Sequence, residues 1–88
     1  MIKVTRIGDQ TYAVDVDGPP ATIHKVHLSR EYSRKLTAGQ VSDEALILRS
    51  FEFLLERESN TSILREFDLR VIGRYFPEYE NEIRETLG

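Results

Sequence analysis

The stretch from Ser42 to Glu58 reads SDEALILRSFEFLLERE, and its pattern decides the fold. Wound as an α-helix at about 100° per residue, it carries apolar side chains over well over half of its circumference. These side chains are Leu46, Ile47, Leu48, Phe51, Phe53, Leu54 and Leu55. The polar side chains of the middle turns gather on one narrow seam of Arg49, Glu52 and Glu56. A helix that is apolar over so wide an arc must be surrounded by other elements or by a partner chain.

The start of this helix is marked by Ser42, because a serine side chain can accept hydrogen bonds from the exposed N–H groups of a first helical turn. Asp43 and Glu44 follow in that turn, where negative charge is favourable. The sequence therefore predicts a central apolar helix over residues 43–58.

The chain before residue 29 has the pattern of β-strands. Residues 11–17 alternate between two faces, and the apolar face consists of Tyr12, Val14 and Val16. A weaker strand precedes them over residues 2–7, and Gly8-Asp9-Gln10 connects the two as a short hairpin. Gly18-Pro19-Pro20 ends the second strand, since proline cannot donate a backbone hydrogen bond.

A third strand follows over residues 22–28. It places Val26 and Leu28 on one face, and on the other face it places Ile23, Lys25 and His27. Together the three strands predict a small antiparallel meander with one solvated face.

Between this meander and the central helix, Ser29 is predicted to cap a short helix over residues 30–36. Its buried side would carry Tyr32 and Leu36, which lie one turn apart. Gly39 is expected to end this helix in the left-handed conformation.

After the central helix, Ser62 is predicted to cap a new helix that begins with Ile63–Phe67. One unbroken helix as far as Phe76 would scatter apolar side chains all round it, so the pattern favours a restart at Asp68. Pro77 fits only the first turn of the last predicted helix, Glu78–Leu87.

Composition places the chain among globular domains. Its 88 residues are enough for one domain with a modest core, and 40% of them are hydrophobic and 31% charged. Without cysteine there is no disulfide framework, no thiolate metal site and no thiol nucleophile. The sequence shows neither the apolar core of a signal peptide nor a membrane span, and we expect a cytoplasmic protein.

Charge is distributed unevenly within the net value of −3. Residues 21–41 hold four basic residues and one acidic residue, whereas residues 42–88 hold six arginines and eleven acidic residues. General nucleic-acid affinity is disfavoured by this balance, although the second block offers a local basic patch.

The segment KVHLSREYSRKLTAGQVSDEALILRSFEFLLE resembles the ribbon-helix-helix family of DNA-binding proteins and antitoxins over residues 23–57. The resemblance implies a dimer in which two chains pair their strands into a ribbon that reads the major groove. It places Lys25 and His27, together with Ile23 and the nearby Arg30, toward DNA. It also places residues 40–42 near a phosphate. Here the first helix is short, two strands precede the ribbon strand, and an acidic helical tail follows.

Three further segments, SFEFLLERE, ILREFDL and RYFPEYE, are similar to a small bacterial domain family of uncharacterised function. This resemblance implies an independently folding domain, and it brings no activity, cofactor or catalytic residue with it.

The candidate catalytic and metal-binding residues are sparse. His24 and His27 lie three apart on one predicted strand and so face opposite ways, which indicates two ordinary, partly exposed histidines rather than a metal site. Asp15 and Asp17 could meet Lys25 or His27 across the sheet, as cross-strand pairs on a solvated face. The serines lie at caps, no glycine-rich phosphate loop occurs, and Glu52 and Glu56 lie beside arginines. An enzyme is not favoured, and neither a cofactor nor a metal is predicted.

The segment Tyr75-Phe76-Pro77-Glu78-Tyr79 holds three aromatic residues in five. It is either a satellite of the core or an exposed patch for a protein partner, because Tyr and Arg are favoured at the centres of interfaces. The candidate interface residues are Arg70, Arg74, Tyr75 and Tyr79.

These patterns predict one α+β domain over residues 1–88, with strands in residues 1–28 and four or five helices in residues 29–88 around the central helix. The favoured function is a non-catalytic domain that binds a protein or associates with itself, with no membrane and no small molecule involved. The alternative is a DNA-binding dimer of the ribbon-helix-helix type. Left open are the oligomeric state and whether residues 63–76 form one helix or two.

Overall fold

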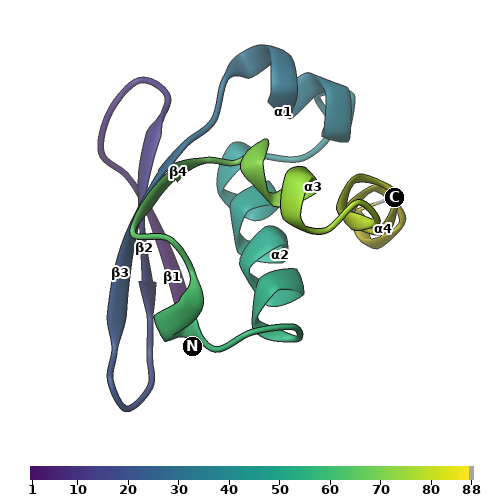
Figure 1. The fold of residues 1–88 in the computed structure, drawn as a ribbon. Helices are drawn as coiled ribbons and strands as arrows, with labels where there is room; N and C mark the ends of the chain where they lie inside the picture. Colours follow the sequence, from purple (N-terminus) through teal and green to yellow (C-terminus); the bar gives the residue numbers. More distant parts are fainter. Residues whose placement is uncertain (88) are drawn as a thin grey trace.

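A computed structural model describes residues 1–87, in which helices pack against one face of a single sheet (Figure 1). Its elements in chain order are β1 (Ile2–Arg6), β2 (Thr11–Val16), β3 (Thr22–His27), α1 (Arg30–Thr37), α2 (Asp43–Leu55), a 3-10 turn (Asn60–Ser62), β4 (Glu66–Asp68), α3 (Val71–Tyr75) and α4 (Tyr79–Leu87). The predicted α+β class is confirmed. The sheet is larger than predicted, because the described chain forms four strands in the order β1-β2-β3-β4.

The three N-terminal strands pair antiparallel, as their alternation predicts. Tyr12 faces Arg6 of β1 and Val26 of β3, and the pairing continues along both neighbours of β2. The helix-facing side of β2 is buried at each apolar position, namely Tyr12, Val14 and Val16. The other side of the sheet is bare, and Ile23 is 64% exposed there.

The prediction of a helix that begins with Ile63–Phe67 is wrong, because part of this segment belongs to the fourth strand, β4. Its backbone groups bond to β3 instead of to a preceding helical turn: Lys25 N donates to Arg65 O at 2.7 Å, and Leu69 N donates to His27 O at 2.9 Å. Phe67 and Leu69 are both buried, with the period of two typical of a strand. β4 therefore runs parallel to β3, which lies between β2 and β4 in the sheet.

The segment from residue 63 to residue 76 is neither one helix nor two. It is a strand followed by α3, a helix of five residues. Asp68 does cap, because its Oδ1 accepts from Arg70 N at 3.0 Å, but it caps the turn that precedes α3. After Pro77 the predicted last helix is present as α4, with Tyr79 and Ile83 buried on its inner side.

Two of the three predicted serine caps are present, whereas Ser62 lies in the 3-10 turn and β4, not a helix, follows it. Ser29 Oγ accepts from Tyr32 N, and Ser42 Oγ accepts from Ala45 N, both at 3.1 Å. α1 ends at Thr37, one residue later than predicted, and the left-handed conformation begins at Ala38, with φ of 55°, one residue before the predicted Gly39. Gly39 follows with φ of 75°, so both residues of this turn are left-handed.

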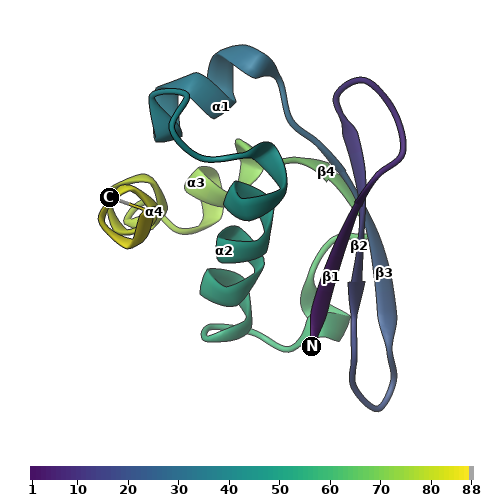
Figure 2. The same cartoon turned by 180° about the vertical axis from the view of Figure 1, so that it is seen from behind.

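The predicted surrounding of α2 is confirmed within the chain itself. One side of the helix packs on the sheet, where the Phe51 ring lies 5.4 Å from His24 and 6.0 Å from Phe67. The other side packs on α4, where the rings of Phe53 and Tyr79 are 5.2 Å apart. Figure 2 shows α2 between the sheet and α4. No helix within residues 1–87 combines the length and the apolar character needed to cross a membrane.

Candidate functional site

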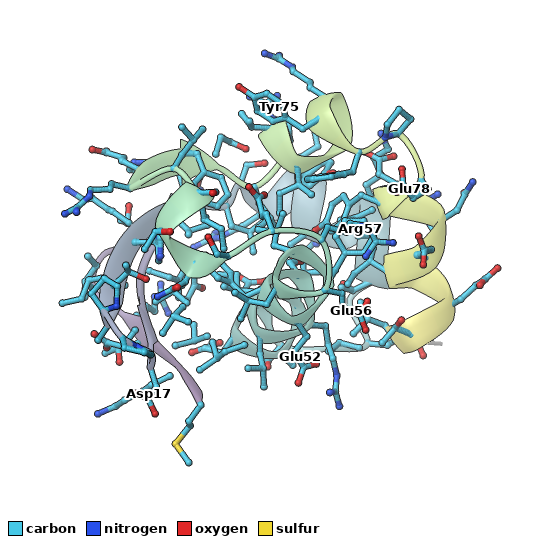
Figure 3. All side chains as sticks on the ribbon, turned by 60° about the horizontal axis from the view of Figure 1, so that its bottom comes forward. Asp17, Glu52, Glu56, Arg57, Tyr75 and Glu78 are labelled. Carbon is cyan, nitrogen blue, oxygen red and sulfur yellow. The ribbon has the colours of Figure 1, made fainter. Side chains whose placement is uncertain are left out.

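The predicted interface residues fall into two places. Tyr75 is 67% exposed at the end of α3, and Arg70 and Arg74 are exposed on the same short segment. Figure 3 shows Tyr75 at the outer rim of the molecule. Arg70 Nε lies 3.2 Å from Asp68 Oδ1, so this arginine is paired within its own turn.

Tyr79 belongs to the core, and its prediction as an interface residue is wrong. It is fully buried, its ring packs on Phe53, and its hydroxyl lies 2.6 Å from Ser50 Oγ. Ser50 Oγ in turn donates to Leu46 O at 2.8 Å, which leaves it free to accept from the tyrosine. Burial raises the pKa of Tyr79. The sequence of α2 does not indicate that its buried Ser50 is the hydrogen-bond partner of the Tyr79 hydroxyl.

A groove with an apolar lining opens beside Tyr75. Its volume is about 230 Å³, and we call it the Leu64–Tyr75 groove. It is lined by Leu54, Glu58, Ser62, Ile63, Leu64, Phe67, Val71, Ile72, Tyr75 and Phe76. The floor is core, since Leu54, Ile63 and Ile72 are buried. The rim is exposed, with Leu64 at 48% and Tyr75 at 67%, so two large apolar side chains border the opening.

One wall of the groove is the loop that carries Leu64, and a chain of partly buried hydrogen bonds holds it. Asn60 Nδ2 donates to Thr22 Oγ1 at 3.0 Å, and Thr22 Oγ1 lies 2.9 Å from His24 Nε2. His24 Nδ1 then lies 2.8 Å from Leu64 O, so Nδ1 carries the proton and Nε2 accepts from the threonine. Each polar group along this chain has a partner, and the loop is therefore anchored to β3.

The prediction of two partly exposed histidines is wrong for His24, which is buried under Phe51. It is correct for His27, whose Nε2 lies 2.8 Å from Glu66 Oε2 on the bare face of the sheet. The hydrogen bond from His27 holds the pKa of the Glu66 carboxyl below its usual range. The two rings face opposite sides, as predicted, and residues 1–87 contain no cluster of three or more potential metal ligands.

Within residues 1–87, neither Asp15 of β2 nor Asp17, which follows this strand, forms an ion pair with a basic residue of β3. Asp15 pairs in register with Ile23, and Asp17 lies 3.4 Å from the N-terminal amine. The cross-strand partner of Lys25 is Ala13. The expected charge pairs across the sheet are therefore wrong, because β4 brings Glu66 to His27 instead.

The candidate DNA contacts lie on two elements. Lys25 and His27 are on the bare face of the sheet, and Arg30 begins α1, where its guanidinium lies 3.3 Å from Asp9 Oδ1. Over residues 25–27, β3 is paired on both edges. A ribbon between two chains needs a free edge at this strand, and β4 occupies it.

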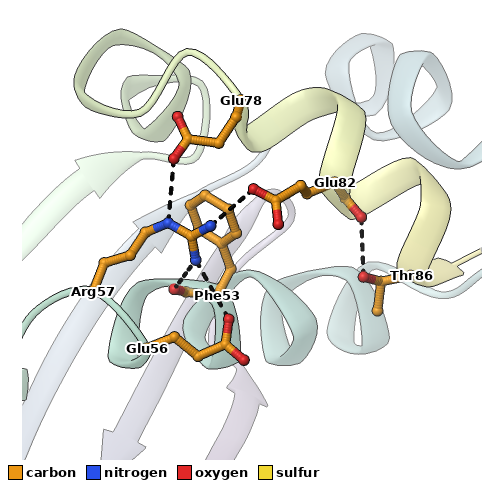
Figure 4. Close-up of polar contacts among 6 residues, drawn as sticks. All are labelled: Phe53, Glu56, Arg57, Glu78, Glu82 and Thr86. Carbon is orange, nitrogen blue, oxygen red and sulfur yellow. Dashed lines mark hydrogen bonds and ion pairs between the residues drawn. The ribbon is translucent and has the colours of Figure 1, made fainter.

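The polar seam of α2 is exposed, and its end forms a closed cluster. Arg49 pairs with Glu52 at 2.9 Å in the solvent. Two residues after the helix, the guanidinium of Arg57 lies over the Phe53 ring, 3.6 Å from its centroid. It also lies 3.3 Å from Glu78 Oε2 and 2.8 Å from Glu82 Oε2, and these ion pairs tie the end of α2 to α4 (Figure 4). We call these four residues, Phe53, Arg57, Glu78 and Glu82, the Arg57 cluster.

Chemically, the Leu64–Tyr75 groove offers apolar contact with one carboxylate, Glu58, in its lining. The hydroxyl of its serine, Ser62, lies 3.4 Å from Ser59 Oγ. An apolar side chain is the group that such a lining can contact over most of its surface.

Comparison of the chain with protein-family models, with curated proteins and with solved structures found no match. The resemblances to ribbon-helix-helix proteins and to the small bacterial domain family therefore stay predictions.

Proposed function

We propose that this domain is a non-catalytic, cytoplasmic protein-binding module that receives an apolar side chain of its partner in the Leu64–Tyr75 groove. The observation that carries the proposal is the pair of exposed apolar side chains, Leu64 and Tyr75, at the rim of a groove with a core-like floor. Exposed apolar side chains are common singly, but their gathering around a concave surface is typical of interaction sites.

The size of the groove supports a side chain rather than a cofactor. Pockets that hold small molecules or cofactors usually measure about 300–1,000 Å³, and this one measures about 230 Å³. A single bulky residue from a partner, inserted beside Tyr75, matches the anchor-in-pocket arrangement of interface centres.

Two arginines next to the rim residues in sequence favour an acidic partner segment, against one carboxylate, Glu58, in the lining itself. Arg65 follows Leu64 in the chain, and Arg74 precedes Tyr75. Neither arginine forms an ion pair within residues 1–87. Complementary charge guides encounter and discriminates between partners, so the partner we propose carries a bulky apolar residue flanked by carboxylates.

The test is selection from a phage-displayed library of random peptides against the immobilised wild-type domain. Enriched peptides are expected to share a bulky apolar residue with Asp or Glu nearby. Substituting Tyr75→Ala should then weaken their binding about tenfold or more, and Arg74→Glu should weaken it further at low salt.

Ile23→Ser is the matched control, because Ile23 is as exposed as Tyr75 but lies on the bare face of the sheet. It should leave peptide binding unchanged. Peptides that bind the Tyr75→Ala variant as tightly as wild type, or a library that yields no enrichment, would overturn the proposal.

A further inference from the structure

β1 is an edge strand whose outer backbone groups face away from the sheet. The sheet order gives β1 a single neighbour, β2. Asp17 N donates to Met1 O at 3.1 Å, and Ile7 N donates to Thr11 O at 3.0 Å. In an antiparallel pair the bonded residues alternate, so the odd-numbered residues of β1 bond to β2. The N–H and C=O groups of the even-numbered residues, Ile2, Val4 and Arg6, therefore point outward.

Within residues 1–87 nothing bonds to these three outward residues on the open side. The long side chain among them is also turned away from the edge. Arg6 Nη2 donates to Asp9 O at 3.0 Å, and Arg6 Nε donates to Gly8 O at 3.0 Å, which folds the guanidinium onto the hairpin turn. Natural edge strands are usually protected by short length, charged side chains, prolines or bulges. β1 contains no bulge in its pairing with β2 and no proline, and its protection is limited to its length of five residues and to Lys3 and Arg6.

The sequence of β1 is complementary to itself in one antiparallel register. With Val4 opposite Val4 of a second copy, Ile2 lies opposite Arg6, and Lys3 lies opposite Thr5. The outward-bonding residues then face one another, and about six backbone hydrogen bonds form. A shift by two residues in one direction places Lys3 opposite Lys3, where like charges repel. A shift by two in the other direction places Thr5 opposite Thr5 and leaves about four backbone hydrogen bonds instead of six. A shift by one residue puts the bonding groups out of phase.

Half-buried apolar side chains flank the open edge on its helix-facing side. Ile2 and Val4 are partly exposed on β1, and Leu48 and Leu55 are partly exposed on α2, which packs over β1. Leu48 and Leu55 are seven residues apart and so lie on one stripe of the helix. Figure 2 shows β1 and α2 side by side at this edge. A second copy at β1 brings its own Ile2 and Val4 to the same place, and burial of these side chains adds to the backbone bonds.

We propose that two copies of this chain associate through β1 in the Val4-centred antiparallel register, which joins their sheets into one. The surface is separate from the Leu64–Tyr75 groove and leaves that groove open in both copies. Because the shared strand is short, the dimer should form in a concentration-dependent manner.

The first test uses cross-linking, for which the absence of cysteine from the sequence is an advantage. In the proposed register, residue 4 faces itself across the two-fold axis at a Cα separation of about 5.5 Å, within the range of a disulfide. The Val4→Cys variant should therefore form a covalent dimer under mild oxidation. Ile2→Cys is the matched control, because residue 2 faces residue 6 and not itself.

The second test changes charge on the exposed outer face, where folding is not at stake. Thr5→Glu places a carboxylate opposite Lys3 of the second copy and should raise the dimer fraction measured by light scattering across a concentration series. Thr5→Lys should lower that fraction. A wild-type mass that stays monomeric at all concentrations, equal masses for the two Thr5 variants, or cross-linking of Ile2→Cys as fast as that of Val4→Cys would overturn the proposal.

Discussion

Two neighbouring faces at the end of α2 meet very different surroundings. On one face Phe53, and Arg57 just after the helix, are covered by α4 and the residue before it, which supply two carboxylates and the Tyr79 ring. On the other face Leu54, and Glu58 just after the helix, line the Leu64–Tyr75 groove, whose other walls are the loop that carries Leu64 and the short α3. The two faces belong to the same end of α2, and the segments that cover them differ. An arginine or a tyrosine therefore indicates a candidate binding site only where no other segment of the chain covers it.

The largest effect on stability is expected from truncation of the buried tyrosine on the covered face, Tyr79. Tyr79→Ala removes a buried ring and leaves a cavity between α2 and α4, and it should lower the free energy of unfolding by about 3–5 kcal/mol. Urea denaturation followed by circular dichroism measures this. Tyr79→Phe, which loses only the hydroxyl on Ser50, should lower stability by about 1 kcal/mol. A loss below about 1 kcal/mol for Tyr79→Ala would contradict the assignment of this ring to the core.

The next test concerns the Arg57 cluster itself. Arg57→Ala removes three ion pairs, a hydrogen bond to Phe53 O and the contact with the Phe53 ring, from a side chain that is only 22% exposed. We expect the free energy of unfolding to fall by about 1–3 kcal/mol, because hydrogen bonds to charged groups contribute more to stability at partly buried sites than at exposed ones.

Arg49→Ala is the matched control for Arg57→Ala in the same denaturation experiment. Arg49 pairs with Glu52 in the solvent, where both side chains are 48% exposed, and such pairs contribute less than about 1 kcal/mol. An equal decrease in the free energy of unfolding for the two variants would show that the ion pairs of Arg57 with Glu78 and Glu82 do not stabilise the fold.

A smaller effect is expected from the contact of α1 with α4 on the covered side. Tyr32 donates to Glu80 Oε2 at 2.8 Å, and this hydrogen bond, with Lys35 nearby, holds the pKa of the Glu80 carboxyl below its usual range. A depressed folded pKa stabilises the native state above the unfolded value near 4.3, and this stability is lost as the pH falls through the folded value. Stability should therefore decline below about pH 4.5 in wild type.

Tyr32→Phe removes the main cause of the Glu80 shift and should make this acid decline shallower in urea denaturation at a series of pH values. His27→Gln is a suitable control, because it affects Glu66, the other carboxyl whose pKa is lowered, on the bare face of the sheet. An unchanged acid limb in Tyr32→Phe would exclude Glu80 as its source.

The smallest effect on stability should come from the open side. Tyr75→Ala removes a side chain that is 67% exposed, and the free energy of unfolding should change by no more than about 0.5 kcal/mol. Binding of selected peptides should nevertheless fall, so that association weakens more than stability does. Equal losses of both would place Tyr75 in the core and close the comparison.

Local chemistry accounts for what the sequence predicts correctly. Ser29 and Ser42 act at helix starts, and Tyr12, Val14 and Val16 alternate along a strand; each of these signals depends on near neighbours in the chain. The sequence does not predict β4, because its three residues form a strand only through backbone pairing with β3, which is far away in sequence. The local pattern of Ile63–Phe67 does not separate a helical turn from a short strand.

The candidate site was predicted only in part for the same reason. Arg74 and Tyr75 lie on an exposed segment, which is one of the two alternatives that the sequence leaves open, since the short α3 leaves them uncovered. Their role in an interface stays a prediction. Tyr79 was misplaced because its burial depends on Ser50, a polar residue inside an apolar helix. His24 was missed because both of its ring nitrogens find partners, Thr22 and the distant Leu64 O, that no sequence spacing reveals.

The parallel pairing of β4 with β3 also governs the order in which the chain can fold. His27 and Glu66 are 39 positions apart, and α1 and α2 must be made before they meet. The hairpins of the first three strands close early over short loops, whereas the last ladder has to wait for a long loop to close, and such long-range contacts slow folding. On the ribosome, β3 therefore emerges with one edge vacant and stays so until Asp68 has been synthesised. In that interval the nascent chain exposes an unpaired, aggregation-prone edge of β3 in addition to that of β1, and in the finished domain β4 pairs with this edge.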